Sequence, residues 1–79
     1  MDVRVALIGI VVKDRQCIKM LNEILGEYGE YITGRMGIPH NKGDISLISV
    51  GIEASQDVIN TLSGKIGQLQ GVTSKVIYA

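Results

Sequence analysis

The sequence has few of the residues on which catalysis and metal binding usually depend. Its 79 residues include one cysteine, Cys17, and one histidine, His40, and neither tryptophan nor phenylalanine. A single cysteine excludes an internal disulfide and a zinc site built on paired cysteines. Nucleophilic catalysis needs a nucleophile, a base and an orienting group within hydrogen-bond reach, and Cys17 and His40 fall in different parts of the expected topology. We therefore expect no enzyme activity, no metal site and no cofactor.

The chain also lacks an excess of charge and a long hydrophobic run. Eight basic residues balance eight acidic ones, so no overall positive field attracts nucleic acid. Its tyrosines, at 28, 31 and 78, do not fall on the central strands where RNA-binding domains of this size stack bases. The apolar run at residues 5–12 is far shorter than the roughly 20 residues that cross a bilayer. We expect a cytoplasmic protein with neither a nucleic-acid element nor a membrane segment.

What the chain has in abundance is aliphatic and β-branched residues. They fill residues 3–12 and 45–52, which predicts two strands in the interior of a sheet. Residues 31–38 and 72–78 alternate less cleanly, and Lys75 lies in the second of them, as is typical of edge strands. We expect a turn after residue 38 to join the second and third strands into a hairpin.

Two other segments repeat apolar residues at helical spacing, residues 18–28 and 58–69. Asp14 and Ser55 precede them and can accept hydrogen bonds from the free amides at a helix start. Gly71 is expected to end the second helix. The resulting βαββαβ order predicts an α+β, ferredoxin-like sandwich in which both helices cover one face of a four-stranded antiparallel sheet.

The first strand predicts self-association, because the helices can cover only one face of the sheet. Large apolar side chains occupy both sides of this strand, since successive residues point in opposite directions. One side carries Val3, Val5, Leu7 and Val11, and the other carries Ala6, Ile8, Ile10 and Val12. One of these sets has no partner within the chain. We expect a homo-oligomer, a dimer or a tetramer, that packs through the open sheet face or through edge strands.

Six residues are candidates for binding a small molecule at a subunit interface. They are Asp14, Arg15, Gln16, Cys17, Arg35 and His40. The first four follow the first strand, where free amides can hold a carboxylate. Cys17 is either a small packing residue or a thiol activated by a helix start. His40 is either a solvated turn residue or a proton switch.

Several segments carry a resemblance to a known family. They are the Arg-Met-Gly-Ile-Pro-His segment at 35–40, the Leu-Ser-Gly-Lys-Ile-Gly segment at 62–67 and the Val-Val-Lys-Asp-Arg segment at 11–15. With them, nearly the whole chain resembles the iron-only hydrogenase system regulator family of stand-alone ACT-like domains. The resemblance implies a single ACT-like domain over residues 1–79 with a regulatory, ligand-sensing role in that system.

The resemblance also marks a difference from ACT domains that sense amino acids. In those domains the first strand ends in an Asp-Arg-Pro-Gly-like turn whose glycine lets the ligand approach the backbone. Asp14 and Arg15 fit that turn, whereas Gln16 and Cys17 stand in place of the proline and the glycine. Two alternatives to ligand sensing stay open: a non-catalytic oligomeric scaffold, and a small enzyme or metal carrier that uses Cys17 and His40.

Overall fold

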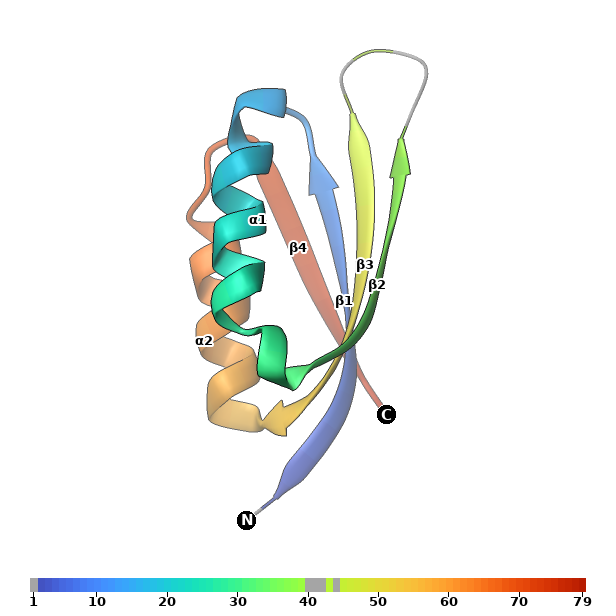
Figure 1. Ribbon diagram of the computed structural model, residues 1–79, viewed down its shortest axis with the longest axis vertical. Coiled ribbons are helices and arrows are strands. Elements are labelled where there is room, and N and C mark those ends of the chain that lie inside the picture. The colour runs from blue at the N-terminus through green and yellow to red at the C-terminus, as the bar shows by residue number, and fades with distance from the viewer. Residues whose placement is uncertain (1, 40–42, 44) are drawn as a thin grey trace.

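The strands form one antiparallel sheet in the order β2-β3-β1-β4 (Figure 1). They are β1 (Val3–Val12), β2 (Ile32–Pro39), β3 (Ser46–Ser55) and β4 (Val72–Tyr78). The computed structural model describes residues 2–39, 43 and 45–79. The ferredoxin-like βαββαβ fold is confirmed, and the two strands richest in aliphatic residues are the two central ones.

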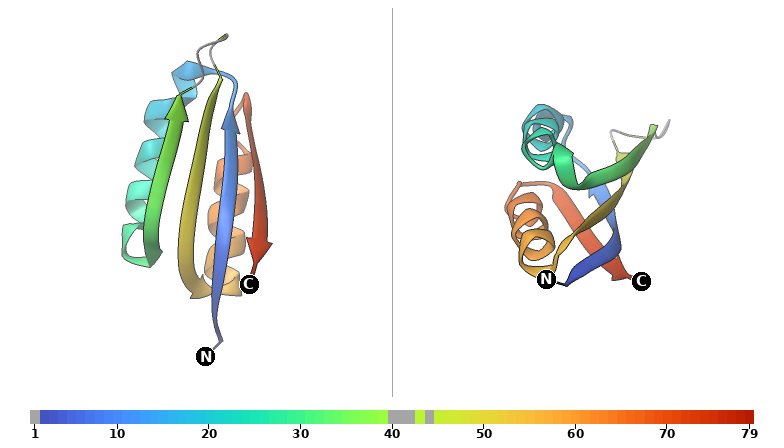
Figure 2. Two further views of the ribbon diagram at one scale, coloured as in Figure 1. Left: turned by 90° about the vertical axis from the view of Figure 1, so that its right-hand side faces the viewer. Right: turned by 60° about the horizontal axis from the view of Figure 1, so that its bottom comes forward.

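Both helices lie on the same face of this sheet (Figures 1 and 2). They are α1 (Ile18–Glu27), which follows a 3₁₀ turn at Arg15–Cys17, and α2 (Gln56–Gly67). Ser55 caps α2 as expected, because its hydroxyl accepts a hydrogen bond from the Val58 amide at 3.2 Å. A second 3₁₀ turn, Gly29–Tyr31, leads from α1 into β2.

Most element ends lie within three residues of the expected ones, and Asp14 and Gly71 have roles that differ from the expected ones. The Asp14 carboxylate accepts a hydrogen bond from the Gln16 amide at 3.0 Å, only two residues on, so it closes the 3₁₀ turn instead of capping α1. The second helix ends at Gly67, and Gly71 serves the turn into β4 with a φ of 77°. This left-handed conformation favours glycine.

The core lies between the helices and the face of the sheet that they cover. All fourteen buried side chains of the described residues are apolar. They are Ala6, Ile8, Ile10, Val12, Leu21, Leu25, Ile48, Val50, Ile52, Ala54, Ile59, Leu62, Ile66 and Val72. Each large aliphatic side chain among them contributes roughly 1.5–3 kcal/mol to folding.

The opposite side of the sheet, which we call the open face, has no helix on it. The left view of Figure 2 looks onto this face, with both helices behind the sheet. Its exposed large apolar side chains, placed there by the strand register, are those of Val3, Val5, Leu7, Met36, Ile38, Leu47 and Ile77. The predicted division of β1 into two apolar sides is therefore confirmed.

Candidate functional site

A groove of about 280 Å³ separates the first half of α1 from the hairpin strands β2 and β3. We call it the α1–β2 groove. Its lining includes Ile18 and Asn22 from α1, Arg35 and Gly37 from β2, and Ser46 and Ile48 from β3. Ile18 and Asn22 are four residues apart, so both lie on the helix face that looks toward the hairpin.

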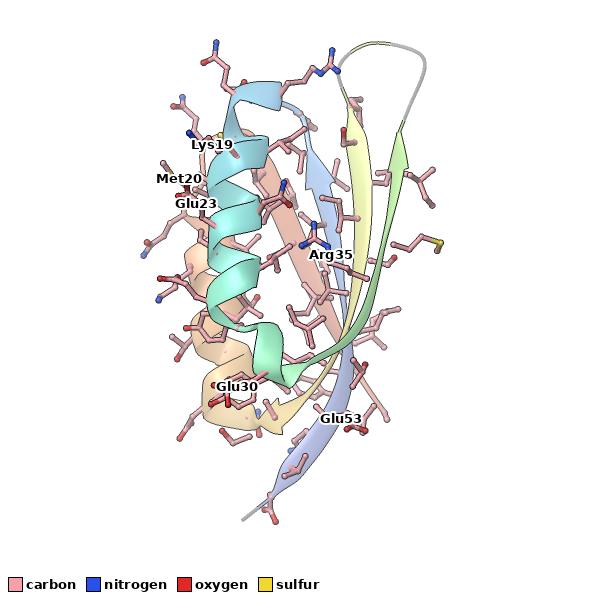
Figure 3. All side chains as sticks on the ribbon, viewed as in Figure 1. Lys19, Met20, Glu23, Glu30, Arg35 and Glu53 are labelled. Atoms are coloured by element: carbon pink, nitrogen blue, oxygen red, sulfur yellow. The ribbon has the colours of Figure 1, made fainter. Side chains whose placement is uncertain are left out.

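Arg35 is the cationic side chain of this groove. Its Nη2 donates a 2.7 Å hydrogen bond to Oδ1 of Asn22, so the guanidinium connects the edge strand to the helix. Figure 3 shows the Arg35 side chain extending from β2 toward α1. A guanidinium carries five N–H donors, and the bond to Asn22 occupies one of them. The geometry holds the group at the mouth of the groove, where its other donors can meet a ligand.

A bulge in β2 gives Arg35 this direction. The register of β2 against β3 shifts between Ile32 and Gly34, so one extra residue is inserted into the edge strand. After the bulge Arg35 lies opposite Val50, whose side chain is buried on the helix side. Because a one-residue shift exchanges the two faces of a strand, the bulge turns Arg35 toward α1.

A shallow depression adjoins the groove on the outer surface of α1. Arg15, Lys19 and Glu23 line it together with Ile18 and Asn22, which it shares with the groove. The two hollows are thus continuous along one helix face. Across both, the lining includes the cationic side chains of Arg15, Lys19 and Arg35 and one carboxylate, that of Glu23.

The turn that follows β1 is anchored to the connection between α2 and β4. The Cys17 thiol donates a 2.8 Å hydrogen bond to the Gln70 carbonyl, and the Lys13 amide donates a 2.7 Å bond to the Gly71 carbonyl. Gly71 also lies so close to Asp14 that a Cβ on it would be 2.8 Å from the Asp14 Cβ. These contacts fix Asp14 and Cys17 against the α2–β4 connection, where they hold the turn in place.

The six sequence-predicted residues thus separate into groups. Arg15 and Arg35 border the continuous surface along α1, while Asp14 and Cys17 pack against the α2–β4 connection. Gln16 borders a small hollow near Met20 that shares Lys19 and Glu23 with the depression on α1. His40 lies outside the described residues.

The sequence analysis did not assign four lining residues to a site: Ile18 and Asn22 of the groove, and Lys19 and Glu23 of the adjoining depression. Ile18 was assigned only to the apolar stripe of the first helix. The signal that could have found Asn22 is its spacing, since a polar side chain four residues after Ile18 must share its helix face.

Metal coordination and membrane insertion find no support in the part of the chain that the structure describes. Residues 2–39, 43 and 45–79 contain no group of three or more His, Cys, Asp or Glu side chains that could hold a metal ion. Neither described helix combines the length and the apolar character that a transmembrane segment needs.

Comparisons with known proteins agree on one family. The TM1266-like family model, described as "Iron-only hydrogenase system regulator, putative", matches residues 4–76. The solved structure of the uncharacterized protein TM1266 from Thermotoga maritima is similar, with 31% sequence identity and a TM-score of 0.92, and the match covers 98% of each chain. No curated protein matches the sequence.

Proposed function

This chain belongs to the TM1266-like family, and from that premise we propose that it is a regulatory module of the iron-only hydrogenase system that binds a small organic anion in the α1–β2 groove. The observation that carries the proposal is the Arg35 guanidinium, held at the groove by its bond to Asn22. The family description names a regulator, and the anion is the part of the proposal that this chain's own residues support.

The groove offers the two kinds of contact that a small amphipathic acid needs. A guanidinium recognises a carboxylate through two parallel N–H donors, which gives direction as well as charge. The half-buried Ile18 and the buried Ile48 offer apolar wall beside it. Pockets for small molecules usually combine an apolar lining with a few polar groups of this kind. Arg35 is the only charged side chain in the described lining of the groove, so the groove favours an anion over a cation.

Binding in the groove would be transmitted through the contact between α1 and the edge strand. The Arg35–Asn22 bond joins two elements that share few other polar contacts among the described residues. A ligand that engages Arg35 shifts the position of the edge strand β2 relative to α1, provided that it binds one arrangement more tightly. Such a displacement of β2 is the signal that a partner of the regulatory module would detect.

The experiment is a thermal-shift screen of the purified chain against amino acids, dicarboxylates and nucleotides, repeated with Arg35→Ala. A ligand present at about 100 times its dissociation constant stabilises the folded state by about 2.7 kcal/mol. We expect at least one carboxylate to stabilise the wild-type chain and not Arg35→Ala. Arg4→Ala is the matched control. Arg4 also makes one side-chain hydrogen bond, to Gln56 at 3.1 Å, but it lies near the start of β1 and does not line the groove.

Three results would contradict the proposal. A screen in which no anion shifts the melting temperature would favour the scaffold alternative, in which the chain acts without a ligand. Stabilisation that persists in Arg35→Ala would place the ligand elsewhere on the chain. An equal loss in Arg4→Ala and Arg35→Ala would indicate only a general attraction between anions and arginines.

A further inference from the structure

We propose that two copies of this chain associate through the open faces of their sheets. The inference starts from the distribution of exposed apolar side chains. Of the eight large hydrophobic residues that are exposed among the described residues, seven lie on the open face, and the eighth, Met20, is on α1. Random surface exposure would scatter such residues over the molecule, so their concentration on one side indicates a contact surface.

These apolar residues come from all four strands and form two groups on the open face. Leu7 lies between Gly51 of β3 and Ile77 of β4 in the strand register. Toward the hairpin end, Leu47 of β3 lies between Val11 and Ile38. Neighbouring strands are about 4.8 Å apart, close enough for such cross-strand side chains to touch. Gly9, Ser49 and Lys75 lie between these two groups, so the apolar surface reaches all four strands in two groups.

The size of the patch suits a second copy. Four strands at about 4.8 Å spacing, each with about seven residues at 3.3 Å rise, give a face of about 450 Å² in projection. Two such faces together bury about 900 Å² when each is treated as flat, and projecting side chains add to this area. The value is close to the roughly 1,000 Å² that a specific interface needs. A single face of this size falls within the range of the largest apolar patches on monomers, about 300–600 Å², and such patches are often functional.

The shape and the charge of the open face are compatible with its own copy. A hollow of about 380 Å³ lies over Gly51, with Leu7 and Ile77 in its lining. Within the strands, the face carries one acid, Glu53, and one base, Lys75, so it is neutral. In a two-fold interface each patch meets the same patch, so projections of one copy can fill the hollow of the other and unlike charges can face each other.

The sheet edges are less suited to joining copies. A bulge interrupts β2 between Ile32 and Gly34, and Lys75 lies in β4. Bulges and edge lysines are the features by which proteins prevent edge-to-edge pairing. The face, and not the edge, is therefore the contact that we infer.

The experiment compares Met36→Lys with Met20→Lys. Met36 is 59% exposed on the open face and Met20 is 55% exposed on α1, so the two substitutions place the same charge at equally accessible sites (Figure 3 labels Met20). We measure molecular mass by sedimentation and light scattering at about 100 μM, above the micromolar dissociation constants that the weaker interfaces show. We expect two copies or more for the wild-type chain and for Met20→Lys. Met36→Lys should raise the dissociation constant by about tenfold or more, or give a monomer.

Leu7→Lys is the second variant, because Leu7 lies nearer the centre of the patch and should disrupt association more strongly. Circular dichroism of each variant establishes that it is folded. A monomeric wild-type chain would overturn the inference, and a heterologous protein would then be the occupant to seek. Association that survives both Met36→Lys and Leu7→Lys, or that is lost in Met20→Lys, would also overturn it.

Discussion

Leu7 and Ile8 are neighbours in one strand and meet opposite environments. Ile8 is completely buried beneath the helices, whereas Leu7 is 46% exposed on the open face. Both sides of β1 are equally aliphatic, so the difference arises from the number of helices that the chain can supply and not from the strand itself. The covered face holds the fold together, while the open face keeps apolar surface available for contact with another molecule.

The largest expected effect is the contrast between Ile8→Ala and Leu7→Ala. Truncation of Ile8 leaves a cavity in the core, and we expect it to lower the free energy of unfolding by about 3 kcal/mol. Leu7→Ala removes a half-exposed side chain without forming a cavity, so we expect less than about 1 kcal/mol at low protein concentration. Urea unfolding followed by circular dichroism measures both values.

Measurements at several protein concentrations further distinguish Leu7→Ala from Ile8→Ala. Association stabilises the folded state, and Leu7→Ala weakens the contact that we infer, so its effect on unfolding should grow as the protein concentration rises. The effect of Ile8→Ala should change less. Equal losses for the two variants at low concentration would show that the two faces do not differ in the way we describe.

The next effect in size concerns two glycines, one beside the covered core and one on the open face. Gly71→Ala forces a side chain into a left-handed conformation with φ 77°, and its Cβ would lie 2.8 Å from the Asp14 Cβ. We expect a loss of about 2–3 kcal/mol.

Gly9→Ala is the matched control for that substitution. A Cβ at Gly9 would meet no atom within 4 Å, so we expect a change within about 0.5 kcal/mol at low protein concentration. Denaturant unfolding measures both variants. A large loss in Gly9→Ala under those conditions would mean that the open face is more tightly packed than its exposed side chains indicate.

A third pair of substitutions compares two serines of β3. The Ser55 hydroxyl caps α2, one of the two helices that cover the core, and Ser55→Ala should cost about 1 kcal/mol. Ser49 lies on the open face opposite Gly9, and Ser49→Ala should change the free energy of unfolding little. Thermal unfolding of both variants tests this expectation, and comparable losses would argue against the role of the cap.

Much of this architecture could be predicted from the sequence, because two periodicities determine it. The dense aliphatic segments identified β1 and β3 as central strands, and the three- and four-residue spacings identified both helices. Ser55 was found as a cap because its side chain acts on an amide only three residues away. Local chemistry of this kind is visible in the sequence itself.

The direction of Arg35 could not be predicted, because it depends on the bulge in β2. Simple alternation from Ile32 would place Met36 and Ile38 on the helix side and Arg35 on the open face. The register shift reverses all three. Nothing in the sequence specifies where one strand gains a residue over its partner, so the groove and the full extent of the open face both appeared only in three dimensions.

The smallest expected effect concerns the outer surface of the covering layer. Lys65 Nζ lies 3.9 Å from Glu27 Oε1, and the two side chains are 47% and 64% exposed. Solvent screens such a pair, so Glu27→Gln should lower the free energy of unfolding by less than about 0.5 kcal/mol, and less still at high salt.

Lys65→Gln should cost somewhat more, because the Lys65 ammonium also lies 5.3 Å from the centre of the Tyr28 ring. Urea unfolding at low and at high salt measures both variants. A loss above about 1 kcal/mol that salt does not reduce would mean that charged contacts between α1 and α2, and not only their buried aliphatic side chains, hold the helices on the sheet.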